Sequence, residues 1–157
     1  MKESLKSGFS FGITTGIITT LGLIVGLNSG THSALAVLGG IASIAVSDGL
    51  GEAVGMHVAK ESERKNSNYV WQSTFATFAA KFVTTMTFAI PVLFVNLQTA
   101  VAVDIAWGML LLVGLSYLVA KEKGEPAAGD IFQHLLFAVA IIVVAHYVGL
   151  LLNAYFS

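Results

Sequence analysis

Five long apolar segments, separated by short polar breaks, constrain this chain of 157 residues more than any other feature. They lie at about residues 8–27, 34–58, 70–95, 100–120 and 131–153. A helix needs about 20 mostly apolar residues to cross a bilayer. Backbone polar groups in lipid must be hydrogen-bonded internally, so each segment is predicted to be an α-helix. We expect an all-α polytopic membrane protein in which residues 1–157 form a single transmembrane domain.

The composition excludes several classes of protein. Only 11% of the residues are charged, whereas a soluble domain carries about 25%. The chain has no cysteine, which excludes disulfides and thiolate metal sites. It contains no phosphate-binding glycine loop, no zinc-protease histidine pair and no recognisable set of nucleophile and base. We therefore expect a protein that is not an enzyme and has no nucleic-acid partner.

The basic residues outside the apolar segments predict the orientation of the chain. Cytoplasmic loops of membrane proteins carry an excess of lysine and arginine. With five spans, every basic residue in a polar break falls on one side of the membrane: Lys2, Lys6, Lys60, Arg64, Lys65, Lys121 and Lys123. We expect the N-terminus inside and the C-terminus outside. No organelle address is recognisable, so the expected location is a prokaryotic cytoplasmic membrane.

Two acidic residues lie inside the second apolar segment. Asp48 and Glu52 are four residues apart, so they share one helix face about one turn from each other. Met56 follows after four more residues. Acidic side chains within membranes mark ion paths or proton relays, and carboxylates with a thioether suit Mn²⁺ or Fe²⁺. We predict that Asp48, Glu52 and Met56 bind a metal ion; the alternatives are a structural acidic pair and a methionine that only packs.

A lysine in the third segment lies at the same depth as the two acids. Lys81 is about eleven residues from the inner end of its helix, and Asp48 is about ten, which places both near 15 Å deep. We therefore predict that Lys81 pairs with Asp48 or Glu52 until a proton or metal ion breaks the pair. His146, about ten residues from the outer end of the fifth segment, is expected to be buried. It would relay protons or make a structural hydrogen bond.

Small and hydroxyl side chains alternate in the first segment. Gly12 and Gly16 belong to a stripe at a spacing of four, which permits close helix crossings in lipid. Thr15 and Thr19 lie between and beyond these glycines. Threonine hydroxyls can bond to their own helix or line a polar path. We expect these four residues either to line a pore or to pack closely against another helix.

Three further residues carry local expectations. Pro91 is expected to kink the last turns of the third helix, because proline cannot donate a backbone hydrogen bond. Asp130 is expected to be the N-cap of the fifth helix. Asp104, about one turn from the outer end of the fourth helix, is expected to lie at the membrane interface.

Several motifs, in this order along five spans, resemble the vacuolar iron transporter (VIT) family. The resemblance covers nearly the whole chain. The family includes the yeast vacuolar importer and the plant nodulin-like members. The motifs are Gly8-Phe-Ser-Phe-Gly12, Gly26-Leu-Asn-Ser-Gly30, the run from Ala45 to Ser62, Phe88-Ala-Ile-Pro91 and His146-Tyr-Val-Gly149.

This resemblance implies a homodimer with a metal path between the subunits, lined by the first two helices. It implies transport of Fe²⁺ or Mn²⁺ out of the cytoplasm in exchange for protons, with no permanently bound cofactor. By position, the family's helix-two methionine falls on Glu52 and its following glutamate on Met56, while the helix-one aspartate falls on Phe11. The family's large cytoplasmic metal-binding domain is missing, since only residues 59–69 join the second and third helices.

Two other functions remain open at this stage. The loss of the helix-one aspartate and of the cytoplasmic domain is compatible with a non-transporting membrane scaffold or regulatory protein that keeps the transporter fold. In that case Asp48 and Lys81 form a structural pair. The second alternative is a transporter of another small solute, which competition by metal ions would reveal.

Overall fold

Six α-helices make up the computed structural model, which describes residues 2–156. They are α1 (Glu3–Thr31), α2 (Ala34–Ser62), α3 (Ser67–Thr87), α4 (Ala89–Phe94), α5 (Leu97–Lys123) and α6 (Ala127–Phe156). The short α4 continues α3, so the described chain has five helical spans that are long and apolar enough to cross a membrane. The all-α fold and the five spans are thus confirmed.

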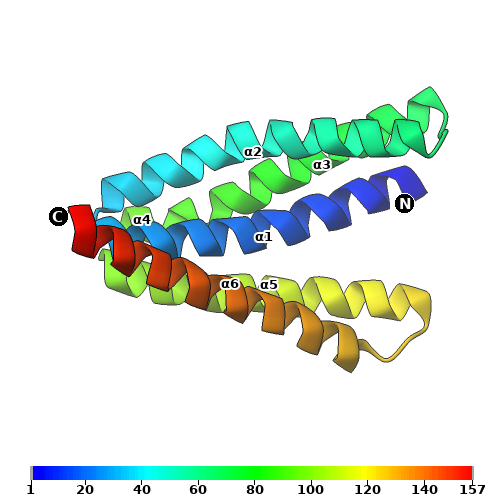
Figure 1. Cartoon of the computed structure of the whole chain (residues 1–157). Coiled ribbons are helices and arrows are strands. Elements are labelled where there is room, and N and C mark those ends of the chain that lie inside the picture. The colour runs from blue at the N-terminus through cyan, green and yellow to red at the C-terminus, as the bar shows by residue number, and fades with distance from the viewer. Residues whose placement is uncertain (1, 157) are drawn as a thin grey trace.

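The polar turns that carry basic residues lie together at one end of the bundle. Figure 1 shows the N-terminus, the α2–α3 turn and the α5–α6 turn at this end, with the C-terminus at the other. Lys6 of α1 forms an ion pair with Glu122 of α5 here, at 2.9 Å. We call this the charged end. Its assignment to the cytoplasm stays a prediction from the distribution of lysine and arginine.

The helices extend beyond the apolar segments that predict them. Three of them begin at an N-cap whose side-chain oxygen accepts a hydrogen bond from the backbone N–H three residues later. These N-caps are Ser33, Asn66 and Asn96. These three helices therefore begin at the polar breaks.

The prediction that Asp130 is the N-cap of the last helix is wrong. Its first helical residue is Ala127, so Asp130 lies inside the first turn. A carboxylate is favourable there because it interacts with the positive end of the helix dipole. Asp130 also lies 3.9 Å from the ammonium group of Lys123, across the α5–α6 turn.

The third span is broken at Phe88, as the position of Pro91 predicts. Pro91 has no N–H to donate to the carbonyl of Thr87, four residues earlier. Beside this break, the Thr87 hydroxyl donates a hydrogen bond to the carbonyl of Thr84 and accepts one from the Trp107 indole N–H at 3.1 Å. The break is thereby tied to α5.

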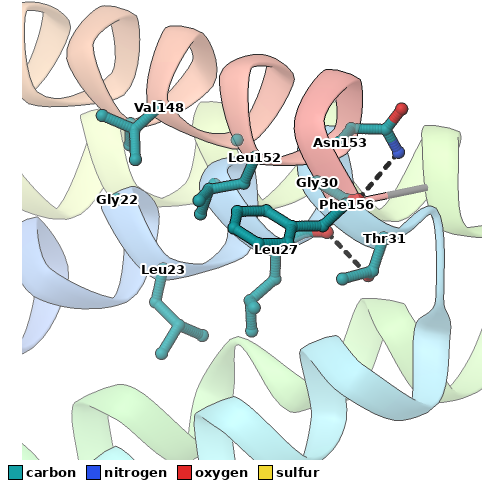
Figure 2. Close-up of a pocket in the computed structure, with 12 residues that line it drawn as sticks. Gly22, Leu23, Leu27, Gly30, Thr31, Val148, Leu152, Asn153 and Phe156 are labelled. Carbon is teal, nitrogen blue, oxygen red and sulfur yellow. Dashed lines mark hydrogen bonds between the residues drawn. The ribbon is translucent and has the colours of Figure 1, made fainter.

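The central element is α1, which contacts α2, α3, α5 and α6. Its glycines bring neighbouring backbones close. A Cβ atom on Gly12 would lie 2.5 Å from the Thr77 carbonyl oxygen of α3, and one on Gly30 would lie 3.4 Å from the Gly149 carbonyl oxygen of α6. The half of α1 near the charged end therefore packs on α3, and the other half packs on α6, where residues of both helices line one pocket (Figure 2).

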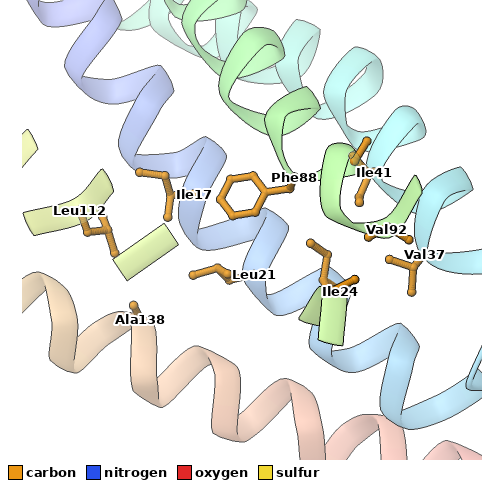
Figure 3. Close-up of a cluster of buried hydrophobic side chains, with 11 residues drawn as sticks. Ile17, Leu21, Ile24, Val37, Ile41, Phe88, Val92, Leu112 and Ala138 are labelled. Atoms are coloured by element: carbon orange, nitrogen blue, oxygen red, sulfur yellow. The ribbon is translucent and has the colours of Figure 1, made fainter. Parts of the chain in front are cut away.

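Apolar side chains from α1, α2, α4 and α5 form the core, together with one residue of α6 (Figure 3). Its buried members are Ile17, Leu21, Ile24, Val37, Ile41, Phe88, Ala89, Val92, Ala100, Leu112 and Ala138. In contrast, α6 has only Ala138 and Gly149 buried, and exposes large apolar side chains along its length. Such an exposed apolar surface fits contact with lipid.

The close crossing at Gly12 predicts a position-specific effect of a single methyl group. Gly12→Ala should lower the free energy of unfolding by about 1–3 kcal/mol, because the added Cβ overlaps the α3 backbone. Gly114→Ala is the matched control, since nothing lies within 4 Å of a Cβ on Gly114. Thermal unfolding in detergent measures both. Equal melting temperatures for the two variants would contradict the close crossing.

Candidate ion site

Lys81 of α3 is a fully buried lysine near the middle of a span that is long and apolar enough to cross a membrane. It lies on a polar stripe, because the buried face of α3 also carries serine and threonine residues. Several of their hydroxyls donate to carbonyls of their own helix, as Thr77 does to Ser73 at 2.8 Å. The partners of Lys81 lie on another helix.

The partners of Lys81 are the two carboxylates of α2. The Lys81 Nζ atom lies 2.5 Å from Asp48 Oδ2 and also bonds Glu52 Oε1. This is the pairing that the depth of the three residues predicts. The antiparallel packing of α2 on α3 brings the charges together.

A hydroxyl of α1 completes the cluster. Thr15 Oγ1 donates a hydrogen bond to Glu52 Oε2, so this carboxylate is bound on both of its oxygens. Glu52 is 18% exposed and Asp48 is 38% exposed, whereas Lys81 is wholly buried. The cluster, which we call the Lys81 cluster (Thr15, Asp48, Glu52 and Lys81), thus has a sealed cationic side and an acidic side that opens outward.

The Lys81 cluster has more acid than base. One ammonium faces two carboxylates, so the fully ionised cluster carries one negative charge in surroundings of low dielectric. An uncompensated charge within a membrane is costly. The cluster is therefore attractive to a cation.

Met56, the third predicted metal ligand, is buried on α2 one turn nearer the charged end than Glu52. Among residues 2–156 the structure contains no group of three or more histidine, aspartate or glutamate side chains that could hold a metal ion. Lys81 occupies the carboxylates that would otherwise serve. A metal ion could use Asp48 and Glu52 only if the ammonium withdrew from them.

The glycines and threonines of α1 divide between the two expected roles. Gly12 and Gly16 are buried against α3, which is close helix packing. Thr19 is exposed and bonds the Thr15 carbonyl at 2.8 Å. Thr15 reaches a charged group on another helix, through its bond to Glu52.

His146 is not part of the cluster, and the expectation that it is buried is wrong. Its side chain is exposed on α6, and Nδ1 lies 2.6 Å from the Ser29 hydroxyl of α1. Ser29 is fourteen residues beyond Thr15, or about 21 Å along the helix. The structure therefore gives His146 a hydrogen bond that joins α1 to α6, far from Lys81.

Asp104 is a buried acid that the sequence places wrongly at the interface. The structure buries it completely, and neither carboxyl oxygen has a hydrogen-bond partner in the described part of the chain. Burying a carboxyl group without a partner is far less costly in its neutral, protonated form. The sequence does contain a pattern that indicates this burial, because Ala100, Asp104 and Gly108 form a stripe of mostly small residues at a spacing of four.

Comparison with known proteins does not assign a family. No protein-family model, no curated protein and no solved structure matches this chain. The likeness to the vacuolar iron transporters therefore stays a prediction that depends on the motifs in the sequence.

Removing the cation of the cluster should destabilise the fold. Lys81→Met leaves two carboxylates facing each other without a counter-ion, which should cost about 3–5 kcal/mol of unfolding free energy. Adding Asp48→Asn and Glu52→Gln to Lys81→Met should restore much of the loss, because no charge then remains. Thermal unfolding in detergent at neutral pH tests the series. An unchanged melting temperature for Lys81→Met would show that the pair contributes nothing.

Replacement of the unpartnered Asp104 should change the stability little, in contrast to replacement of Lys81. Asp104→Asn keeps the shape of the neutral acid and breaks no hydrogen bond, so the free energy of unfolding should change by less than about 1 kcal/mol. The same thermal assay measures it beside Lys81→Met. A large destabilisation would reveal a partner that Asp104 needs.

Proposed function

We propose that the protein is a secondary transporter that moves divalent transition-metal ions, Fe²⁺ or Mn²⁺, out of the cytoplasm in exchange for protons. The observation that carries this proposal is the Lys81 cluster. Two intramembrane carboxylates with a surplus negative charge attract a cation. The choice of Fe²⁺ and Mn²⁺ comes from the resemblance to vacuolar iron transporters.

Charge balance in the cluster suggests how exchange is coupled. Without metal, Lys81 as an ammonium and one further proton neutralise the two carboxylates. With a divalent ion bound, the same carboxylates are balanced when Lys81 is a neutral amine and the extra proton has left. Binding of metal to carboxylates releases protons in this way. One divalent ion is thereby exchanged for two protons without net movement of charge.

We further propose that two copies form a homodimer through the outward face of α2. This face carries exposed small residues at a spacing of four: Gly39, Ser43, Ser47, Gly51, Gly55 and Ala59. Such a stripe permits close approach of a second helix in lipid. A second subunit would also shield the exposed part of Asp48, a charged group that is costly against lipid.

One observation favours the alternative of a scaffold that keeps the fold without transport. Lys81 bonds both carboxylates at once, so the cluster is also a complete structural link between α2 and α3. In that case no cation displaces Lys81. Measurement of flux separates the two functions.

Transport by the cluster should depend on both carboxylates. In proteoliposomes with an imposed pH gradient, the parent should show saturable Mn²⁺ and Fe²⁺ flux, and Asp48→Asn and Glu52→Gln should each abolish it. Glu61→Gln is the matched control, because Glu61 is exposed near the charged end of α2. Flux that survives both cluster changes would move the site elsewhere. A folded parent that carries no divalent ion would leave the scaffold alternative.

A further inference from the structure

A groove of about 560 Å³ runs along the side of α1 that faces α5 and α6, and its lining is mixed, with Phe11, Leu115 and Val119 as apolar members. It is separate from the outward face of α2 proposed to form the dimer. Its polar lining consists of Ser7, Ser10, Thr14, Thr15, Ser116 and His134. Lys123 and Asp130 also border it, at the charged end. The groove therefore has charged groups at its mouth and hydroxyls along its length.

The groove extends to the middle of the membrane. Thr15 lies twelve residues beyond Glu3, or about 18 Å along α1 from the charged end. The hydrocarbon core of a bilayer is about 30 Å thick. Polar side chains at this depth are unusual on a surface that faces lipid. Thr14 bonds its own helix, at Ser10 O and 2.8 Å, as a threonine that faces lipid also can.

Two hydroxyls in the groove lack a partner in the protein. Neither Ser7 nor Ser10 makes a side-chain hydrogen bond within the described residues. A hydroxyl left without a hydrogen bond in apolar surroundings costs free energy. Both side chains are partly exposed toward the charged end, so water at the mouth of the groove can satisfy them.

The histidine of the groove presents a hydrogen-bond acceptor. The Ser116 hydroxyl donates to Leu112 O at 2.7 Å, and its oxygen lies 2.7 Å from His134 Nδ1. When the hydroxyl proton lies on the Leu112 carbonyl, Nδ1 of the histidine is the donor of this bond. In the neutral ring the other nitrogen, Nε2, is then an acceptor. A half-buried acceptor of this kind suits water, a proton or a cation.

Thr15 joins the groove to the Lys81 cluster. It lines the inner end of the groove, and its hydroxyl bonds Glu52. We propose that this groove is a water-filled passage, contained within one subunit, through which water and cytoplasmic cations or protons reach Glu52. That solutes travel through it rests on the proposed transport function; that water fills it does not.

The absence of native cysteines makes the passage directly testable by reaction of single cysteines. Ser10→Cys and Thr14→Cys place a thiol in the groove. Val139→Cys is the matched control for Thr14→Cys, because the two positions lie twelve and eleven residues from the starts of their helices at the charged end, and the Val139 side chain is exposed on the outer surface. Each variant is reconstituted in liposomes with a cationic, membrane-impermeant thiosulfonate on both sides of the bilayer. The thiolate that reacts forms in water and not in lipid.

The two groove thiols should react about tenfold faster than Val139→Cys, or more. Equal and slow reaction of all three would overturn the passage. If the reagent attached to Thr14→Cys left Mn²⁺ flux unchanged, the groove would hold water but would not carry the solute. Fast reaction in a protein whose parent carries no flux would support the wet groove and overturn transport, so the two proposals fail in different ways.

Discussion

The burial of one ammonium group is the constraint on which the rest of the structure depends. Lys81 has no contact with solvent, so its charge is tolerable only beside the carboxylates of α2. This requirement fixes the register of α2 against α3. The hydroxyl of Thr15 then adds α1 to the same cluster. Three of the five spans are thereby positioned by polar bonds in a bundle whose other contacts are mostly apolar.

The bundle contains two kinds of intramembrane acid with different prospects for chemistry. Asp48 and Glu52 are partly exposed and already interact with a cation, so they can exchange partners. Asp104 is sealed in the core between Ala100 and Gly108 and touches no polar group of the described chain. A group without access to water cannot exchange protons unless the helices separate. The Lys81 cluster is therefore the better place for ion exchange in this structure.

What the sequence predicts well is what depends on distance along a helix. The five spans follow from the length of the apolar segments, the break near Phe88 follows from Pro91, and the Lys81 pair follows from equal depths. These inferences need only the rise per residue and the chemistry of proline and of charge.

What the sequence predicts poorly is the direction in which a side chain points. His146 lies on a helix that is apolar on all sides, so its pattern cannot tell a core face from a lipid face. The same ambiguity misplaces Asp104. For Gly12 and Gly16, the spacing permits close packing but does not say that α3 is the partner. The groove between α1, α5 and α6 combines residues from three segments and has no signature in any one of them.

The Lys81 cluster also has a consequence for biosynthesis. A lysine at the centre of a helix opposes insertion into the bilayer by about 2.5–3.5 kcal/mol, and each acid of α2 adds a similar cost when inserted alone. A turn of only four residues, 63–66, joins α2 to α3. If the two helices leave the translocon as one hairpin, each charge enters the lipid already paired, and much of this cost is removed. The ion pair thus favours joint over sequential insertion of these two spans.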